Sequence, residues 1–189
     1  IMKVKNPVLT GFHPDPSILR VGENYYLATS TFQWFPGVEI FHSTDLANWN
    51  FITRPLNEKR LLDMTGIPDS GGVWAPCLSY SNGIYYLVYS NVKTYRNYNK
   101  DVDNFIVTSA DITGPWSDPV YINSSGFDPS LFHDTDGRKY FINMVWDQRD
   151  KSNAFYGIVL QEYDAENKVL IGEPEIIFKG SSIGLTEGP

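Results

Sequence analysis

The sequence lacks the residues that several kinds of site require. Its one cysteine, Cys77, has no partner for an internal disulfide, which excludes a disulfide framework. Its three histidines lie far apart without metal-ligand spacing, so we expect no protein-held zinc and no metal-binding residue in this chain. No apolar run approaches the ~18 residues of a membrane helix, so we expect no membrane partner. The 15 Lys and Arg residues are scattered among 22 Asp and Glu, which argues against a nucleic-acid partner.

The start of the chain also lacks a targeting signal. Residues 1–7 have none of the apolar core that a secretory signal peptide needs. Without that signal or a disulfide framework, a cytoplasmic protein is the favoured expectation. Secretion stays open if a leader has been removed.

Helical periodicity is almost absent, and strand signals take its place. Short alternating or β-branched runs are separated by Gly, Pro, Asn and Asp clusters, and 15% of the residues are aromatic. The Asn82-Gly83 pair suits a tight hairpin. Together these patterns predict an all-β fold. The clearest strands are expected at residues 17–21, 25–31, 38–43, 84–90, 105–109, 139–146, 155–163 and 175–178.

An internal repeat favours one kind of all-β fold over the others. Residues 15–27 align with residues 75–87 and, more loosely, with residues 128–141. Each copy reads as a residue before proline, a short strand, a tight turn and an aromatic strand. The period of roughly 53 to 60 residues suits one four-stranded propeller blade, although tandem hairpin domains have a similar length. The proline step at each start favours the propeller.

The repeat predicts about three blades and the beginning of a fourth. The blades are expected at about 13–60, 73–122 and 127–180, with the fourth starting at 186–189. Three blades alone would leave an unpaired sheet edge and exposed apolar surface. We therefore expect residues 1–189 to be an incomplete catalytic propeller domain, the N-terminal part of a longer protein, and to be inactive alone.

The repeat register also identifies candidate catalytic residues. The first position of each copy of the repeat is occupied by Asp15, Ala75, Asp128 and, in the fourth copy, Glu187. Equivalent positions in a propeller are related by rotation about its axis, so their side chains are expected to meet at one end of the channel. Like charges brought together raise at least one pKa, an arrangement that acid–base sites use.

The prolines suggest how two of these carboxylates are presented. A residue before proline avoids the right-handed helical region, so we expect Asp15 and Asp128 on extended backbone. Proline donates no backbone hydrogen bond, so ladder pairing should end there. A single Asp-Pro-Ser sequence is ordinary turn chemistry. Two copies in repeat register favour a catalytic role instead.

The same stretches resemble glycoside hydrolase family 43, in particular its β-xylosidase branch. The resemblance implies a five-bladed propeller, usually followed by a β-sandwich domain that is absent here. It also implies a homo-oligomer for the complete protein and, in many relatives, an axial calcium whose ligands would lie beyond residue 189. No other cofactor is expected. The stretches that carry the resemblance are residues 6–17, 30–38, 68–76, 124–134, 143–149 and 186–189.

The resemblance assigns a role to each carboxylate. Family members hydrolyse glycosides with inversion, so Asp15 would be the general base that activates water. Glu187 would be the general acid, and Asp128 would hold that acid protonated. Inversion needs about 6.5–9.5 Å between the acid and base carboxyls, which opposite sides of a propeller channel can supply. The implied substrates are xylo-oligosaccharides, which lose terminal xylose, with terminal arabinofuranose as a further candidate.

Aromatic side chains near these acids are candidate sugar-binding residues. Trp74 and Phe32 resemble the family's walls around the terminal sugar, although both could instead be core between blades. Ala75 leaves room for the sugar where a fourth carboxylate would add repulsion. Trp34 and Trp146 could also border the pocket, but we favour their interpretation as core.

Two other functions remain open from the sequence. One is a retaining fructan or sucrose hydrolase, but such enzymes typically carry Asn-Asp-Pro-Asn, Arg-Asp-Pro and Glu-Cys motifs that this chain lacks. The other is a carbohydrate-binding propeller without activity. The presence of all three acids argues against the second.

Overall fold

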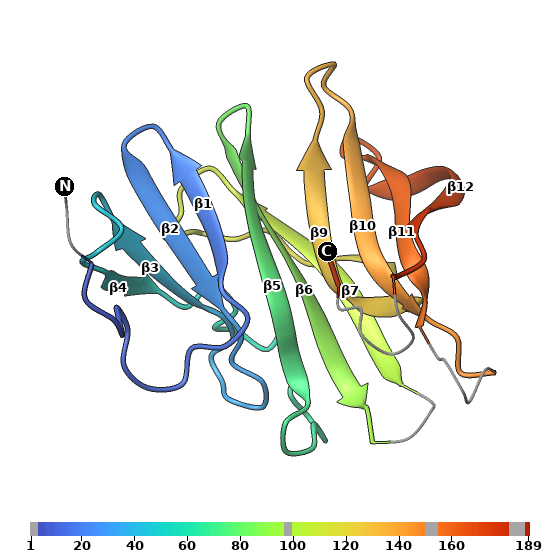
Figure 1. Cartoon of the computed structure of the whole chain (residues 1–189), viewed down its shortest axis with the longest axis horizontal. Helices are drawn as coiled ribbons and strands as arrows, with labels where there is room; N and C mark the ends of the chain where they lie inside the picture. The colour runs from blue at the N-terminus through green and yellow to red at the C-terminus, as the bar shows by residue number, and fades with distance from the viewer. Residues whose placement is uncertain (1–3, 97–99, 150–154, 182–187) are drawn as a thin grey trace.

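The computed structural model describes residues 4–96, 100–149, 155–181 and 188–189. Within these ranges all regular structure is β, arranged as three four-stranded antiparallel sheets that follow one another along the chain (Figure 1). This confirms the all-β expectation. No helix in the described ranges could cross a membrane.

Each sheet is a meander of four successive strands. The first holds β1 (Ser17–Val21), β2 (Asn24–Thr29), β3 (Glu39–Ser43) and β4 (Asn50–Thr53). The second holds β5 (Gly72–Ser81), β6 (Ile84–Thr94), β7 (Asp101–Ser109) and β8 (Val120–Asn123). The third holds β9 (Gly126–His133), β10 (Lys139–Trp146), β11 (Phe155–Asp164) and β12 (Val169–Phe178). Four strands per sheet in chain order is the pattern of propeller blades.

The predicted hairpin after Ser81 is confirmed. Ser81 pairs with Ile84, so the turn contains only Asn82 and Gly83. Both turn residues have positive φ, 51° and 83°. These are the dihedral signs of a type I′ turn, whose twist matches that of the flanking strands.

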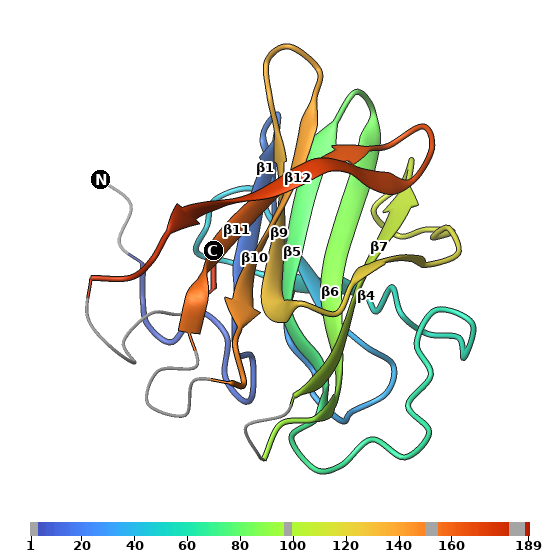
Figure 2. The same cartoon turned by 90° about the vertical axis from the view of Figure 1, so that its right-hand side faces the viewer.

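The three sheets pack against one another through apolar side chains, and Figure 2 shows the same sheets turned by 90°. Ile40 of the first sheet and Leu56, which follows β4, join Leu87 and Val107 of the second sheet in one buried cluster. A second cluster joins β6 to Phe141 of β10. Polar contacts add to this packing between neighbouring inner strands: the Leu78 backbone N–H donates to the Ser17 hydroxyl at 3.1 Å. The strands β1, β5 and β9 therefore lie side by side along the line where the sheets meet.

Candidate active site

The residues singled out by the repeat occupy matching positions in the three sheets. Asp15, Ala75 and Asp128 each stand directly before a proline, and their φ values are 51°, 31° and 53°. The arrows of β1, β5 and β9 point the same way, so these three positions lie toward the same end of the molecule (Figure 1). Left-handed backbone is rare for residues other than glycine and is found often at functional sites.

The expectation of extended backbone at Asp15 and Asp128 is wrong. Proline disfavours the right-handed helical conformation of the preceding residue, and these residues have positive φ in place of the expected extended backbone. The expected end of pairing holds only for β1, which begins after Pro16. In β9 the ladder skips two residues: Phe127 pairs with Met144, and pairing resumes at Ser130.

The skipped residues form a bulge that is repeated in the second sheet. In β5, Trp74 pairs with Ser90 and the next paired residue is Cys77. Two residues, the left-handed one and its proline, therefore face a single residue on the neighbouring strand. Such bulges redirect a side chain away from the regular alternation of a strand. The repeated bulge gives Ala75 and Asp128 the same local geometry.

Asp15 is held by one buried serine. The Ser30 hydroxyl donates to Asp15 Oδ2 at 2.6 Å, and the Ser30 backbone N–H donates to the Pro14 carbonyl at 3.0 Å. Ser30 follows β2 and is only 1% exposed. A short hydrogen bond to a carboxylate is among the stronger kinds and fixes its orientation. Ser30 thus fixes both the carboxylate and the backbone beside it.

Asp128 lies directly under the end of the described chain. A Cβ placed on Gly188 would stand 2.0 Å from the Asp128 Cβ and 2.9 Å from its Oδ2. Only glycine can approach so closely. Glu187, the predicted general acid, lies outside the described residues. Gly188, the next residue in the sequence, lies against Asp128, the predicted partner of that acid.

A row of aromatic rings crosses all three sheets at this end. Phe12 and Phe32 stand 5.7 Å apart between ring centroids, and Phe32 and Trp74 stand 6.1 Å apart. Trp74 meets Phe127 edge-on at 5.6 Å, and Phe127 meets Trp146 at 6.1 Å. The row therefore begins at Phe12, shortly before Asp15 in the sequence, and ends at Trp146, which packs on Phe127 beside Asp128.

The two predicted aromatic walls are firmly fixed. The Trp74 indole donates to the Ser70 carbonyl at 2.8 Å. Phe32 forms an isolated β-bridge with Val73, in which its N–H donates at 2.9 Å. Gly72 makes this approach possible, since a Cβ there would lie 2.3 Å from the Phe32 carbonyl oxygen. Both rings are half-buried, so each packs between sheets and still presents surface.

The interpretation of Trp34 as core is wrong. Trp34 lies on the loop between β2 and β3, is 63% exposed and borders the hollow described below. Trp146 is half-buried against Phe127, in agreement with a core position. The sequence did carry a signal: Trp146 ends the strand predicted at residues 139–146, whereas Trp34 lies between two predicted strands.

Sequence reasoning also missed Lys100. Its ammonium lies 4.5 Å from the Trp146 ring centroid and donates to the Tyr95 carbonyl at 3.1 Å. Burial lowers the pKa of Lys100 below its ordinary value. Lysine on a loop between two strands carries no sequence signal for such a position.

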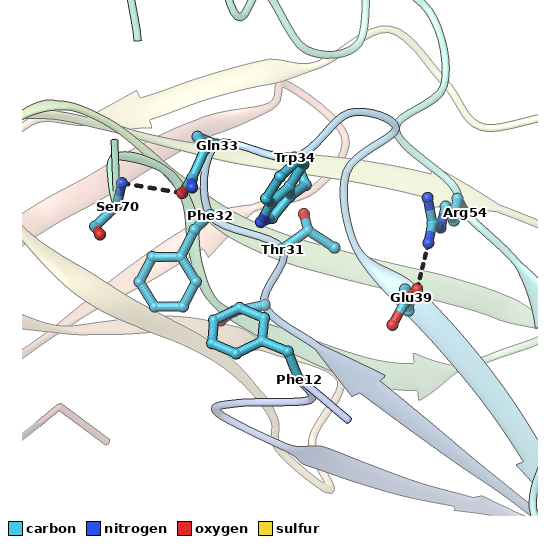
Figure 3. A pocket seen from close by; sticks show the side chains of 9 residues that line it. Phe12, Thr31, Phe32, Gln33, Trp34, Glu39, Arg54 and Ser70 are labelled. Atoms are coloured by element: carbon cyan, nitrogen blue, oxygen red, sulfur yellow. Dashed lines mark hydrogen bonds and ion pairs between the residues drawn. The ribbon is translucent and has the colours of Figure 1, made fainter. Parts of the chain in front are cut away.

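A hollow of about 750 Å³ opens beside Phe32 (Figure 3). Ser30 is one of its walls, which makes the hollow continuous with the surroundings of Asp15. Within the described ranges, no group of three or more His, Cys, Asp or Glu side chains could hold a metal ion. The site therefore offers carboxylates, hydrogen-bond donors and aromatic faces. The hollow is lined by Phe12, Ser30, Thr31, Phe32, Gln33, Trp34, Glu39, Arg54 and Ser70.

Comparison with known proteins decides the family. The model of glycosyl hydrolases family 43 matches residues 4–189. The chain belongs to this family. It therefore supplies three blades of the five-bladed propeller that the family shares.

Individual members of family 43 are similar over the whole chain. A xylosidase/arabinosidase 43B of Humicola insolens is 60% identical over 99% of this chain, and a β-xylosidase of Bacillus subtilis is 57% identical over all of it. The crystal structure of a xylan β-1,4-xylosidase from Bacillus halodurans superimposes with a TM-score of 0.95 at 57% identity, over 98% of this chain. In each comparison this chain spans 35% of the other protein's length.

Proposed function

We propose that the protein carrying this chain is an inverting glycosidase that removes terminal xylose from xylo-oligosaccharides. Terminal arabinofuranose is a second substrate, since some similar proteins are named for both sugars. The observation that carries the proposal is the matching left-handed Asp-Pro step at Asp15 and Asp128 in a chain of family 43. Acids in equivalent positions of different blades point toward one axis.

In the proposed reaction, Asp15 is the general base. Ser30 occupies Oδ2, which leaves Oδ1 to accept a proton from water. The water oxygen attacks the anomeric carbon on the face opposite to the leaving group. One carbon–oxygen bond forms as the glycosidic bond breaks, and the product has the opposite anomeric configuration.

Glu187 is the proposed general acid. It gives its proton to the departing glycosidic oxygen, so the leaving sugar departs as an alcohol. Asp128 stands beside Gly188 and supplies a negative charge close to this acid. A like charge disfavours ionisation of Glu187, which keeps it protonated near neutral pH.

The terminal sugar is proposed to lie against Trp74 and Phe32. A pentose presents apolar C–H groups that pack against aromatic rings. Ala75 leaves space at the one equivalent position that carries no carboxylate. The described part of the chain thus contributes the base, the acid-tuning residue and one wall of the pocket.

The rest of the propeller is proposed to cover the faces that this chain leaves open. Ile171, Ile177 and Phe178 of β12 are 39–52% exposed, and Ile18 of β1 is 58% exposed. These apolar residues lie on the first and last of the three sheets. Further blades packed there would bury them and close the channel around the carboxylates.

Stereochemistry tests this function. A protein as long as the similar family members is incubated with an aryl β-xyloside, and proton NMR follows the first product. The proposal expects the α-anomer first, because inversion changes the configuration. The β-anomer first would indicate a retaining hydrolase, and no product at all would leave only a sugar-binding propeller. Glu187→Gln should abolish turnover of substrates with poor leaving groups, and near-normal activity would remove Glu187 from the acid role.

A further inference from the structure

A row of buried polar side chains crosses the second sheet where it meets the third. Ser90 on β6, Asn104 on β7 and Asn123 on β8 are directly opposite one another in the two ladders. Asn104 stands at the centre of the row and is 0% exposed. The Ser90 hydroxyl donates to Asn104 Oδ1 at 2.6 Å, and Asn104 Nδ2 donates to Asn123 Oδ1 at 2.9 Å.

Asn104 also reaches across to the third sheet. Its Nδ2 group donates a second hydrogen bond, at 2.9 Å, to the backbone carbonyl of Gly126 at the start of β9. A backbone carbonyl can only accept, so this contact fixes which end of the Asn104 carboxamide faces β9. Both N–H groups of the carboxamide are then used. A buried polar group that is fully paired holds its partners in one geometry, whereas apolar packing alone allows them to slide.

Gly126 is held equally closely on its other side. It pairs with Val145 of β10, and a Cβ placed on Gly126 would stand 1.7 Å from the Met144 carbonyl oxygen. Only a residue without a side chain can lie so near that backbone. The start of β9 is therefore fixed between the Asn104 side chain and the backbone of β10.

The fixed start of β9 lies directly before the bulge that carries Asp128. Phe127 is the last paired residue, and pairing resumes at Ser130, so Asp128 and Pro129 lie outside the regular ladder. The position of Asp128 therefore depends on the anchored residues just before it. Gly126, which accepts the hydrogen bond from Asn104, is only two residues away in the sequence.

We propose that Asn104 is a positioning residue for the acid side of the reaction, because it holds the start of β9 so that Asp128 lies close to Glu187. The inference rests on the proposed glycosidase function, in which Asp128 keeps Glu187 protonated. If the hydrogen bond to Gly126 is lost, Asp128 can move away from the acid. The like-charge repulsion on Glu187 then weakens, and the acid loses its proton at lower pH.

The test uses Asn104→Ala in a protein as long as the similar family members and compares two substrates. Xylobiose needs a proton on its leaving oxygen, whereas the phenolate of a dinitrophenyl β-xyloside departs without one. The ratio of kcat/KM for xylobiose to kcat/KM for the dinitrophenyl xyloside should fall about tenfold, as part of the acid's contribution is lost. The basic limb of the kcat/KM–pH profile for xylobiose should move to lower pH. A purely structural role would lower both substrates equally and leave the limb in place.

A second variant and a control accompany Asn104→Ala. Ser90→Ala removes the donor to Asn104 Oδ1 but keeps both N–H groups, so the ratio should fall less, in the same direction. It decides the question if Asn104→Ala does not fold. The control is Ser109→Ala at the other end of β7, where the 6% exposed hydroxyl donates to the Pro115 carbonyl at 2.9 Å. Its ratio and basic limb should match those of the wild type.

Two results separate this inference from the function on which it rests. In Asn104→Ala, or in Ser90→Ala if the first variant does not fold, a ratio within twofold of wild type and an unmoved basic limb would overturn the role of Asn104. The proposed glycosidase would then still stand. A wild-type protein that hydrolyses neither substrate would overturn the function itself.

Discussion

The two ends of the inner strands β1, β5 and β9 are built differently. At the starting end, Asp15, Ala75 and Asp128 adopt left-handed backbone before prolines, and two of the three carry a carboxylate. At the other end, β5 turns into β6 through an ordinary two-residue hairpin. The strands are the same, but the left-handed residues that precede prolines lie at one end only. Under the proposed function, the starting end serves chemistry and the far end serves stability.

Removal of the Asp15 carboxylate should have the largest effect on activity at the starting end of the inner strands. In a protein as long as the similar family members, Asp15→Ala should lower kcat by about 10²–10⁴-fold, because no base remains to activate water. The midpoint of thermal unfolding should change little. Steady-state kinetics and calorimetry on the same sample check both statements. A loss below tenfold would show that Asp15 is not the base.

A carboxylate added at Ala75 tests whether this position at the starting end must stay small and uncharged. Ala75→Asp should lower kcat/KM by about 10–100-fold, since the new side chain fills sugar space and adds like charge. Aspartate tolerates left-handed backbone better than alanine does, so the fold should accept it. Ala75→Gly, which keeps the space open, should retain near-normal kinetics. Equal activity in the Asp and Gly variants would contradict this assignment of Ala75.

A smaller effect is expected at Ser30. Ser30→Ala removes the hydrogen bond that fixes the orientation of the Asp15 carboxylate. In a protein as long as the relatives, kcat should fall severalfold, because the base is then less well positioned toward water. Ser17→Ala is the control, since its hydroxyl accepts from the Leu78 N–H. A kcat for Ser30→Ala equal to that of Ser17→Ala would show that Ser30 does not position the base.

The smallest effect lies at the far end and concerns stability. His133 Nε2 stands 2.9 Å from the Ser79 hydroxyl between β9 and β5, and burial lowers the pKa of His133 to about 4. The unfolded chain binds a proton near pH 6.5, whereas the folded chain resists it. Stability should therefore be complete above pH 6.5 and fall by about 1–2 kcal/mol as the pH drops toward 4, since the half-exposed ring gives less than the full shift.

Urea unfolding at pH 7 and pH 4.5 measures this loss. His133→Asn keeps a polar partner for Ser79 but does not titrate, so its free energy of unfolding should depend less on pH. An unchanged pH dependence in this variant would assign the acid sensitivity to other groups. Neither protein should show altered kcat at pH 7.

Much of the fold could be predicted from periodicity and turn chemistry. The strands at residues 17–21 and 139–146 have the predicted bounds, and the Asn82-Gly83 hairpin is in place. The outer strands β4 and β8 were not predicted. Each has only four residues, too few to establish a period, and its neighbours decide its structure.

The site was predictable where the repeat applied and less so elsewhere. Alignment placed Asp15 and Asp128 in matching positions, but it could not show their left-handed backbone, which at Asp128 accompanies a bulge in the ladder of β9 and β10. The contact of Ser30 with Asp15 joins residues that only folding brings together. The hydrogen bond from Ser70 to Gln33, beside Trp34, likewise joins residues that are distant in the sequence.

A crystal structure of the full-length protein with a bound xylo-oligosaccharide would test the central claim most directly. The quantity to measure is the distance between the carboxyl groups of Asp15 and Glu187 across the bound sugar. Our account predicts about 6.5–9.5 Å, with the two groups on opposite faces of the ring. A separation beyond ~15 Å, or side chains on different surfaces, would contradict it, because no single glycosidic bond could then be reached by both.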